Sequence, residues 1–363
     1  MKVLLLLGFS AGFAGRLTAQ QSDRVGEAQA VLAPLVESYG VSGAEAPVRS
    51  TVERLLPQWA KQKAETDTAG NLWVRVGKGD PLVVFVAHLD EIGFEIKAIR
   101  DDGSLEIETR GGFFPSLFES QPALIHTGTG PVPGVFMPRD SVGSKPERAP
   151  AGFRVDVGTD TRAATESLGV RVGHTITMPK HYVRLAGTRA TGRSFDDRVG
   201  CAALILALRR LTPERLRHEV AFIFSVREEI GLEGAAAAAA SLGVKPARVH
   251  AIDTFVSADS PLEPQTFAVA PIGRGPVARA LDNNSVAPPA LVDSLARLAR
   301  ANGIQLQIGT TNGGNDGAAF AAWGVPDVAI GWALRYSHSP AEVIDLRDVV
   351  GLGDMVRAVA ERW

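Results

Sequence analysis

The sequence predicts an α/β fold: a doubly wound, mainly parallel sheet with helices on both faces, into which a small β-barrel-like domain is inserted. Two observations lead to this prediction. Short, continuous apolar runs alternate with helix-like segments, as in strands buried on both faces of a parallel sheet. One long stretch rich in Gly and Pro breaks the alternation, which is typical of a small barrel or sandwich. The length of 363 residues suits one large domain plus a smaller one.

The individual strands and helices follow from these runs. The four apolar runs expected to form sheet strands are 82–87, 220–226, 249–252 and 328–332. Alanine has the highest helix propensity, so the alanine-rich run 231–243 indicates a helix rather than a linker. The other expected helices follow Arg198 and cover 289–301 and 345–362.

The inserted domain is expected over residues 94–181. This stretch combines Gly/Pro-rich segments such as RGGFFPS with short β-like pieces such as SLEIETR, and residues 163–168 suit one short helix. It contains none of the candidate catalytic residues described below. The large domain would then consist of residues 20–93 and 182–363.

Residues 1–19 have the features of a signal peptide. Lys2 supplies a positive charge, Val3 to Ala14 are mostly apolar, and Ala19 suits a cleavage site before Gln20. The apolar run is shorter than the roughly 20 residues that a membrane-spanning helix needs. We therefore expect a periplasmic or secreted protein without stable membrane insertion after cleavage. A buried N-terminal helix is the alternative.

The composition limits the partners. With 45% hydrophobic and 21% charged residues and a formal charge of -2, the chain is an ordinary globular one. The charge gives no reason to expect nucleic acid or an anionic membrane as partner. The single cysteine, Cys201, excludes an internal disulfide. Because it lies in the apolar run VGCAALILAL, we expect a buried apolar residue rather than a nucleophile.

Polar residues directly follow the first two predicted strands. His88 and Asp90 come after the first strand and, being two residues apart, share a face, so Asp90 is placed to orient a metal-binding histidine. Glu228 and Glu229 come after the second. Carboxylates avoid burial unless they are paired or bind metal. The structural alternatives are an incidental His–Asp pair and a solvated helix start, where acids suit the helix dipole.

Other candidates lie near the ends of the remaining elements. Asp196 and Asp197 open the helix expected after Arg198, where N-capping is the alternative role. Asp253 follows the third strand, and His338 lies in the loop after the fourth. Ligands of open α/β sheets gather at the carboxyl ends of the strands. Two histidines and several carboxylates there form a ligand set for two zinc-like ions with one bridging Asp.

These residues fall within segments that together resemble a known family. The chain resembles the co-catalytic metallo-aminopeptidases that include bacterial glutamyl aminopeptidase and the tetrahedral (TET) aminopeptidases. The segments occur in the family's order and cover nearly all of the chain after residue 19. They include VAHLDEIGFEI (86–96), DVGTDTRAATESLGVRVG (156–173), SFDDRVG (194–200), REEIGLEGA (227–235), AIDT (251–254), GGNDGAA (313–319) and RYSHSPAE (335–342).

The resemblance implies a two-metal aminopeptidase that removes N-terminal residues from peptides. Carried over by motif, His88, Asp196 and Asp253 hold one divalent ion. Asp196 bridges to the second ion, which Glu229 and His338 also hold. We expect the ions to be zinc, with cobalt or manganese as alternatives.

The same resemblance assigns two more roles and an assembly. Glu228 is the general base that activates a metal-bridging water, and Asp90 supports His88. The inserted domain corresponds to the family's dimerisation domain, so a homo-oligomer, either a dimer or a dodecamer, is expected.

Two segments depart from the family's pattern. The usual Asp-Asn-Arg is Asp196-Asp197-Arg198 here, which places an additional acidic residue beside the bridging ligand. The usual Gly-Gly-Thr-Asp-Ala is Gly-Gly-Asn-Asp-Gly over residues 313–317, which changes an expected wall of the substrate pocket.

Two other functions remain open at the level of the sequence. A related two-metal carboxypeptidase or amide deacylase would use the same ligands, because the motifs do not define which end of the substrate is bound. A non-catalytic binding protein on the same fold would have lost ligands. The presence of all five expected ligands and of Glu228 argues against the second alternative.

Overall fold

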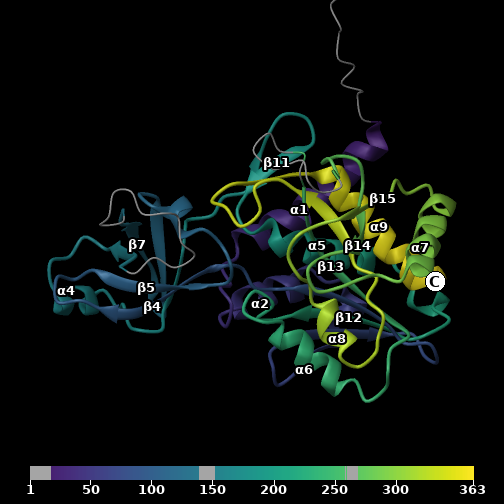
Figure 1. The fold of residues 1–363 in the computed structure, drawn as a ribbon, viewed down its shortest axis with the longest axis horizontal. Helices are drawn as coiled ribbons and strands as arrows, with labels where there is room; N and C mark the ends of the chain where they lie inside the picture. Colours follow the sequence, from purple (N-terminus) through teal and green to yellow (C-terminus); the bar gives the residue numbers. More distant parts are fainter. Residues whose placement is uncertain (1–17, 139–151, 258, 260–268) are drawn as a thin grey trace, which may run out of the picture.

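The computed structural model describes residues 18–138, 152–257, 259 and 269–363. Most of the predicted signal peptide, residues 1–17, lies outside this range. The described part forms a large sheet domain with a smaller barrel at one side (Figure 1). Within it, no helix is both long and apolar enough to cross a membrane.

An eight-stranded sheet forms the centre of the large domain. Its middle pairs, β12–β3, β3–β13 and β13–β16, are parallel, whereas β1, β2 and β14 join antiparallel neighbours. The predicted mainly parallel sheet is thereby confirmed. In sheet order the strands are β1 (Ala64–Thr66), β2 (Leu72–Val76), β12 (Val220–Ser225), β3 (Val83–His88), β13 (Arg248–Val256), β16 (Ile330–Leu334), β14 (Val277–Leu281) and β15 (Gln307–Thr310).

Helices cover both faces of this sheet (Figure 1). The segments 289–301 and 345–362 were expected to be helical, and α7 and α9 match them to within one residue. α1 and α2, which precede the first sheet strand, were not predicted. The helices are α1 (Ala19–Glu37), α2 (Ala46–Leu55), α3 (Gln58–Lys61), α4 (Arg162–Ser167), α5 (Phe195–Arg210), α6 (Glu233–Ser241), α7 (Pro289–Ala301), α8 (Gly317–Ala321) and α9 (Leu346–Arg362).

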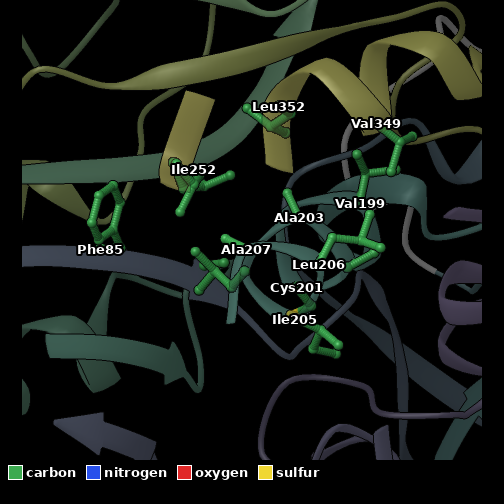
Figure 2. Close-up of a cluster of buried hydrophobic side chains, with 14 of the residues drawn as sticks. Phe85, Val199, Cys201, Ala203, Ile205, Leu206, Ala207, Ile252, Val349 and Leu352 are labelled. Carbon is green, nitrogen blue, oxygen red and sulfur yellow. The ribbon is translucent and has the colours of Figure 1, made fainter. Parts of the chain in front are cut away.

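Successive residues of β3 face two different cores, because side chains alternate along a strand. Val83 and Phe85 pack with residues of α1, α5 and α9 in the larger core, part of which Figure 2 shows. Val84 and Val86 pack with the alanines of α6 and with Phe320 of α8. A strand buried on both faces must be apolar throughout, which explains why the run 82–87 is continuous.

The predicted inserted β region contains a closed six-stranded barrel. A cluster of phenylalanines fills its interior; Phe94 contacts Phe118 and Phe136 edge-on or tilted. In barrel order the strands are β4 (Gly93–Ile99), β5 (Leu105–Arg110), β8 (Arg154–Asp156), β7 (Gly130–Phe136), β6 (Pro122–Thr127) and β9 (Thr175–Thr177). The barrel has its own apolar core, so it packs as a separate unit.

The remaining described elements are a small sheet and two short 3₁₀ helices. A small antiparallel sheet consists of β10 (Val183–Arg184), β11 (Arg189–Gly192) and β17 (Glu342–Asp345). Two 3₁₀ helices, η1 (Pro115–Phe118) and η2 (Pro213–Arg215), interrupt loops.

The order in which strands are added to the sheet reverses at β3. The chain forms β12 on one side of β3 and then β13 on the other. Where the strand order reverses, a crevice opens at the carboxyl ends of the strands, and open α/β sheets bind ligands in this crevice. β3 ends at His88, so the fold places the first candidate residue at this crevice.

Candidate metal centre

The crevice at the end of β3 collects the candidate residues. Glu228 and Glu229 lie shortly after β12, and His338 lies in the loop after β16. Asp253 was expected just after its strand but lies inside β13. β13 pairs with β3 only as far as Ala251. Beyond that point it pairs with β16 alone, so Asp253 borders the open crevice.

Asp196 lies between the two histidines. Its Oδ1 is 3.1 Å from Nε2 of His88, and its Oδ2 is 3.2 Å from Nε2 of His338. The same His338 nitrogen lies 3.4 Å from Oε1 of Glu229. One potential ligand atom from each of His88, Asp196 and Glu229 lies within 4.8 Å of the others, an arrangement that could hold a metal ion.

The second ring nitrogen of each histidine faces a carbonyl oxygen. Nδ1 of His338 is 2.7 Å from the carbonyl oxygen of Gly112, and Nδ1 of His88 is 3.2 Å from that of Asp90. A carbonyl can only accept, so each Nδ1 carries the proton and donates it. In the neutral ring, Nε2 then presents a lone pair toward the Asp196 carboxylate. A cation between them satisfies both groups, as in metal sites with oriented histidines.

The site has more negative than positive charge. Asp196, Glu228, Glu229 and Asp253 line a pocket of about 460 Å³. Burial raises the pKa of Glu228 well above its usual value, and the neighbouring acids add to this effect. Burial and Asp196 raise the pKa of Asp253 to about 6, although Arg279 opposes the shift. Buried carboxylates at this density need a counter-charge, so the donor set fits divalent cations.

The same excess of acids also affects the pKa of His338. Burial alone would lower the pKa of His338, but Glu229 and Asp196 raise it well above its ordinary value. Oε1 of Glu229 is buried and has no hydrogen-bond partner. Buried polar atoms are normally bonded, so this oxygen is a further indication that a metal belongs here.

Asp90 connects the histidine to the pair of glutamates. Its Oδ1 accepts the backbone N–H of Glu228 at 3.0 Å, and its Oδ2 accepts that of Glu229 at 3.1 Å. The hydroxyl of Ser42 donates to Oδ2 at 2.7 Å. The Asp90 carboxylate also lies 3.4 Å from Nδ1 of His88. Asp90 therefore orients three candidate residues without lining the pocket.

Several non-glycine residues around the site have left-handed backbone conformations. The φ angles are 65° at Ser194, 54° at Arg227, 62° at Tyr336 and 56° at His338. Such conformations are uncommon outside glycine and persist where the surroundings over-determine them, often at functional sites. Here they occur beside or at Asp196, Glu228 and His338.

Asp197 and Cys201 lie behind the metal centre. Oδ1 of Asp197 accepts the backbone N–H of Gly200 at 2.9 Å, which is the capping role considered for this acid pair. Its Oδ2 is buried without a partner. The Cys201 thiol is buried, as expected, and donates to the carbonyl oxygen of His88 at 3.2 Å.

A second group of buried charges was not predicted. Glu91, adjacent to Asp90, accepts from Lys180 Nζ at 2.6 Å, Arg193 at 3.0 Å and Arg198 at 3.3 Å. All four side chains are at most 2% exposed. We call these four residues the Glu91 cluster. A second acid directly after Asp90 was the signal for it, but its cationic partners lie about 90 or more residues away in sequence.

Asp316 is a further buried acid that the sequence analysis did not single out. The Ser225 hydroxyl donates to its Oδ2, and its Oδ1 has no partner. Burial raises the pKa of Asp316 to about 7. Its charge raises the pKa of Glu228 in turn, so Asp316 belongs to the electrostatic surroundings of the site.

Most of the chain matches one known protein family. Residues 70–355 match the model of the M42 glutamyl aminopeptidase family. The chain is 30% identical to the lysyl aminopeptidase of Pyrococcus furiosus over 346 residues, which cover 90% of this chain and 95% of the relative.

Solved structures lead to the same family. An aminopeptidase from the archaeon Desulfurococcus kamchatkensis superposes with a TM-score of 0.86 at 29% identity, covering 93% of this chain and 96% of that chain. The TET1 peptidase of Pyrococcus horikoshii, which can assemble into a tetrahedron or a large octahedral shell, superposes with a TM-score of 0.83 at 31% identity. That match covers 94% of this chain and 100% of the other. The chain belongs to the M42 glutamyl aminopeptidase family and is a metal-dependent aminopeptidase.

Proposed function

We propose that the protein is a two-metal aminopeptidase in which Asp196 bridges the two ions. His88 and Asp253 complete one site, and Glu229 and His338 complete the other. The observation that carries the proposal is the position of Asp196, with Nε2 of one histidine beside each carboxylate oxygen at 3.1 and 3.2 Å. A single ion would leave one of these imidazole–carboxylate pairs without a cation. We expect zinc, with cobalt or manganese as alternatives.

Glu228 is proposed as the general base. Two bound divalent ions would lower the pKa of an attacking water and polarise the scissile carbonyl. Glu228 lines the pocket beside Asp196 and Asp253, where it is placed to accept a proton from that water and return it to the leaving amine. Asp90 positions Glu228 through its backbone N–H.

The reaction is tested with amino-acid anilides and their N-acetylated counterparts on protein loaded with zinc, cobalt or manganese. We expect cleavage of the free-amine substrates only, with two metal ions per subunit by mass spectrometry. Cleavage of the N-blocked substrates instead would support the alternative of an amide deacylase. Cleavage from the carboxyl end of unblocked peptides would support a carboxypeptidase.

We further propose that the protein is exported and that residues 1–19 are removed. Lys2 and the apolar run up to Ala14 support this. Thr18 caps α1 through the backbone N–H of Gln21, so cleavage after Ala19 would remove that cap and fray the first turn. N-terminal sequencing of protein from the culture medium or periplasm should begin at or shortly after Gln20. An intact Met1 would contradict export by this route.

We propose that the protein is a homo-oligomer that assembles through the barrel region, about residues 94–181. The assembly of the related TET1 peptidase supports this, as does the separate apolar core of the barrel. Light scattering at micromolar concentration should give at least the mass of a dimer. A monomer would contradict the proposal.

A further inference from the structure

The pocket beside the metal centre has a lining that is charged in part and uncharged in part. Its charged residues are those of the proposed catalytic site, which are Asp196, Glu228, Glu229, Asp253 and His338. Among the residues that the structure describes, the remainder of the lining contains no Lys, Arg, Asp or Glu. The volume of about 460 Å³ is that of a small-molecule pocket, about 300–1,000 Å³. The uncharged part is therefore the part that can select a substrate side chain.

Apolar side chains form much of this uncharged part. Leu232 lies just after the two glutamates, and Val256 is the last residue of β13. The barrel contributes Phe113, Phe114 and Leu117 from the loop around η1. Phe114 is 55% exposed and Leu117 46% exposed. Large apolar side chains left open at a concave surface indicate a binding site for apolar groups.

Neutral amides complete the wall. Asn284 and Asn312 line the pocket, and both are exposed. An amide can hydrogen-bond a substrate but cannot neutralise a charged side chain. Among the residues that the structure describes, this wall therefore offers no counter-ion to an acidic or a basic substrate residue.

One buried arginine, Arg279, lies behind this wall and is bonded to residues that line it. Arg279 donates to the carbonyl oxygens of Thr254 at 2.7 Å and Gly314 at 2.8 Å, and pairs with Asp282 at 2.9 Å. Its side chain is 1% exposed. Its charge is thus committed to the protein and is not available to a substrate carboxylate.

We propose that this aminopeptidase selects substrates whose N-terminal residue has an uncharged, apolar side chain. The inference rests on the proposed function and names its substrate class. An N-terminal Glu or Lys side chain that lies against the uncharged part of the lining would meet no charged partner among the described residues there, which is unfavourable. An apolar side chain of leucine size would instead cover Leu232, Val256 and Phe114.

The first test compares Leu-, Met-, Phe-, Glu- and Lys-anilides on the metal-loaded wild-type enzyme. We expect kcat/KM for the apolar group to exceed that for Glu and for Lys by roughly 10²-fold, because an unpaired charge in a binding site is strongly penalised. If Glu- or Lys-anilide is cleaved best, the inference is wrong although the aminopeptidase function stands. If none is cleaved, the proposed function fails and the inference fails with it.

A matched pair of variants tests where the side chain binds. Asn284→Asp places one negative charge on the pocket wall without changing side-chain size. We expect it to raise the Lys/Leu ratio of kcat/KM about fivefold, the strength of a solvent-exposed ion pair. Asn283→Asp makes the same change at the neighbouring exposed residue, which does not line the pocket, and should leave the ratio unchanged. If the Lys/Leu ratio of kcat/KM is the same in Asn284→Asp and Asn283→Asp, the wall at Asn284 does not bind the N-terminal side chain of the substrate and the inference is wrong.

Binding without turnover gives an independent measurement. In metal-loaded Glu228→Gln protein, leucinamide should raise the melting temperature more than glutamic acid α-amide or lysinamide at the same concentration, because a ligand stabilises the state it binds. A larger shift with either charged amide would contradict the proposal even if the activity assay agreed with it.

Discussion

Asp90 and Glu91 are neighbours in sequence but belong to two opposite electrostatic environments. On one side lie four pocket carboxylates and two histidines, with one histidine beside each oxygen of Asp196. On the other side, the single carboxylate of Glu91 is held by Lys180, Arg193 and Arg198. In the first group the carboxylates outnumber the cations, since Arg279 pairs with only one of them, Asp253, at 3.5 Å, whereas in the second three cations surround one carboxylate.

The consequence is visible in the pKa values. Burial raises the pKa of Glu228, and neighbouring acids reinforce the shift. Burial would do the same to Glu91, but its three cations instead lower its pKa far below the usual range. Burial raises the pKa of both carboxyls, and the neighbouring charges decide whether the net pKa shift is up or down. An acid cluster in which the carboxylates outnumber the protein's own cations needs a further cation to balance its charge.

The largest effect is expected from Glu228→Gln. This substitution removes the proposed base but none of the proposed metal ligands, so metal content should stay at the wild-type level. The rate should fall by about 10²–10⁴-fold, the usual contribution of general acid–base catalysis. Activity and metal content are measured on the same preparation. The matched control is Glu233→Gln, an exposed acid paired with Arg227, which should keep nearly full activity. Wild-type activity in Glu228→Gln would remove Glu228 from the mechanism.

Glu91→Gln should mainly affect folding. It leaves three buried cations without their carboxylate, which typically costs about 3–5 kcal/mol. Denaturant unfolding of metal-free protein measures this, so that lost metal binding makes no contribution. The control is Glu108→Gln, since Glu108 pairs with Lys97 at 2.9 Å on the surface with side chains 42% and 49% exposed. That pair should contribute at most about 1 kcal/mol. Similar losses of unfolding free energy in Glu91→Gln and Glu108→Gln would show that the buried Glu91 cluster contributes no more than a surface ion pair.

Metal removal should have a smaller effect on stability. At a free metal concentration of 100 times Kd, binding stabilises the folded state by about 2.7 kcal/mol, so chelation should lower the melting temperature reversibly. Glu229→Gln should weaken one of the two sites and reduce this metal-dependent shift. Glu91→Gln should leave the shift largely intact once the protein is folded. Metal-independent melting of the wild type would show that the acid cluster is not a metal site.

The smallest effect is expected from Asp197→Asn in metal-free protein. Burial, followed by the charges of Asp253 and Asp196, raises the pKa of Asp197 well above its usual value. A raised pKa in the folded state means that ionisation opposes folding, so the cost is absent near pH 4 and grows as the pH rises. The asparagine variant should therefore gain about 1 kcal/mol over wild type near pH 8, in the range for an unsatisfied buried group. This gain should disappear toward pH 4. A difference in unfolding free energy between the variant and the wild type that does not change with pH would contradict a raised pKa of Asp197.

Much of the fold was predictable because local pattern and burial agree. The run 82–87 is apolar throughout since β3 is buried on both faces. The helix over 289–301 was predicted with the bounds of α7. β2 was missed although LWVRV is a strand-like sequence. α1 was also missed; it begins at Ala19, the last residue of the segment assigned to a signal peptide.

The sequence by itself determined which residue types stand at the strand ends, and hence the composition of the candidate site. His88, Glu228, Glu229 and His338 were all identified from their position after apolar runs. This worked because parallel strands bring their carboxyl ends to one edge of the sheet.

Only the tertiary structure decided how the charges are compensated. Lys180 and Arg193 follow the barrel in sequence, and Arg198 lies in α5, yet all three reach Glu91. The pocket beside the metal centre likewise joins Phe114 of the barrel to Asn284 and Val256 of the sheet domain. Electrostatic energy depends on distance in space rather than on separation along the chain. Whether an acid meets a protein cation or an open site is therefore set by the folded arrangement.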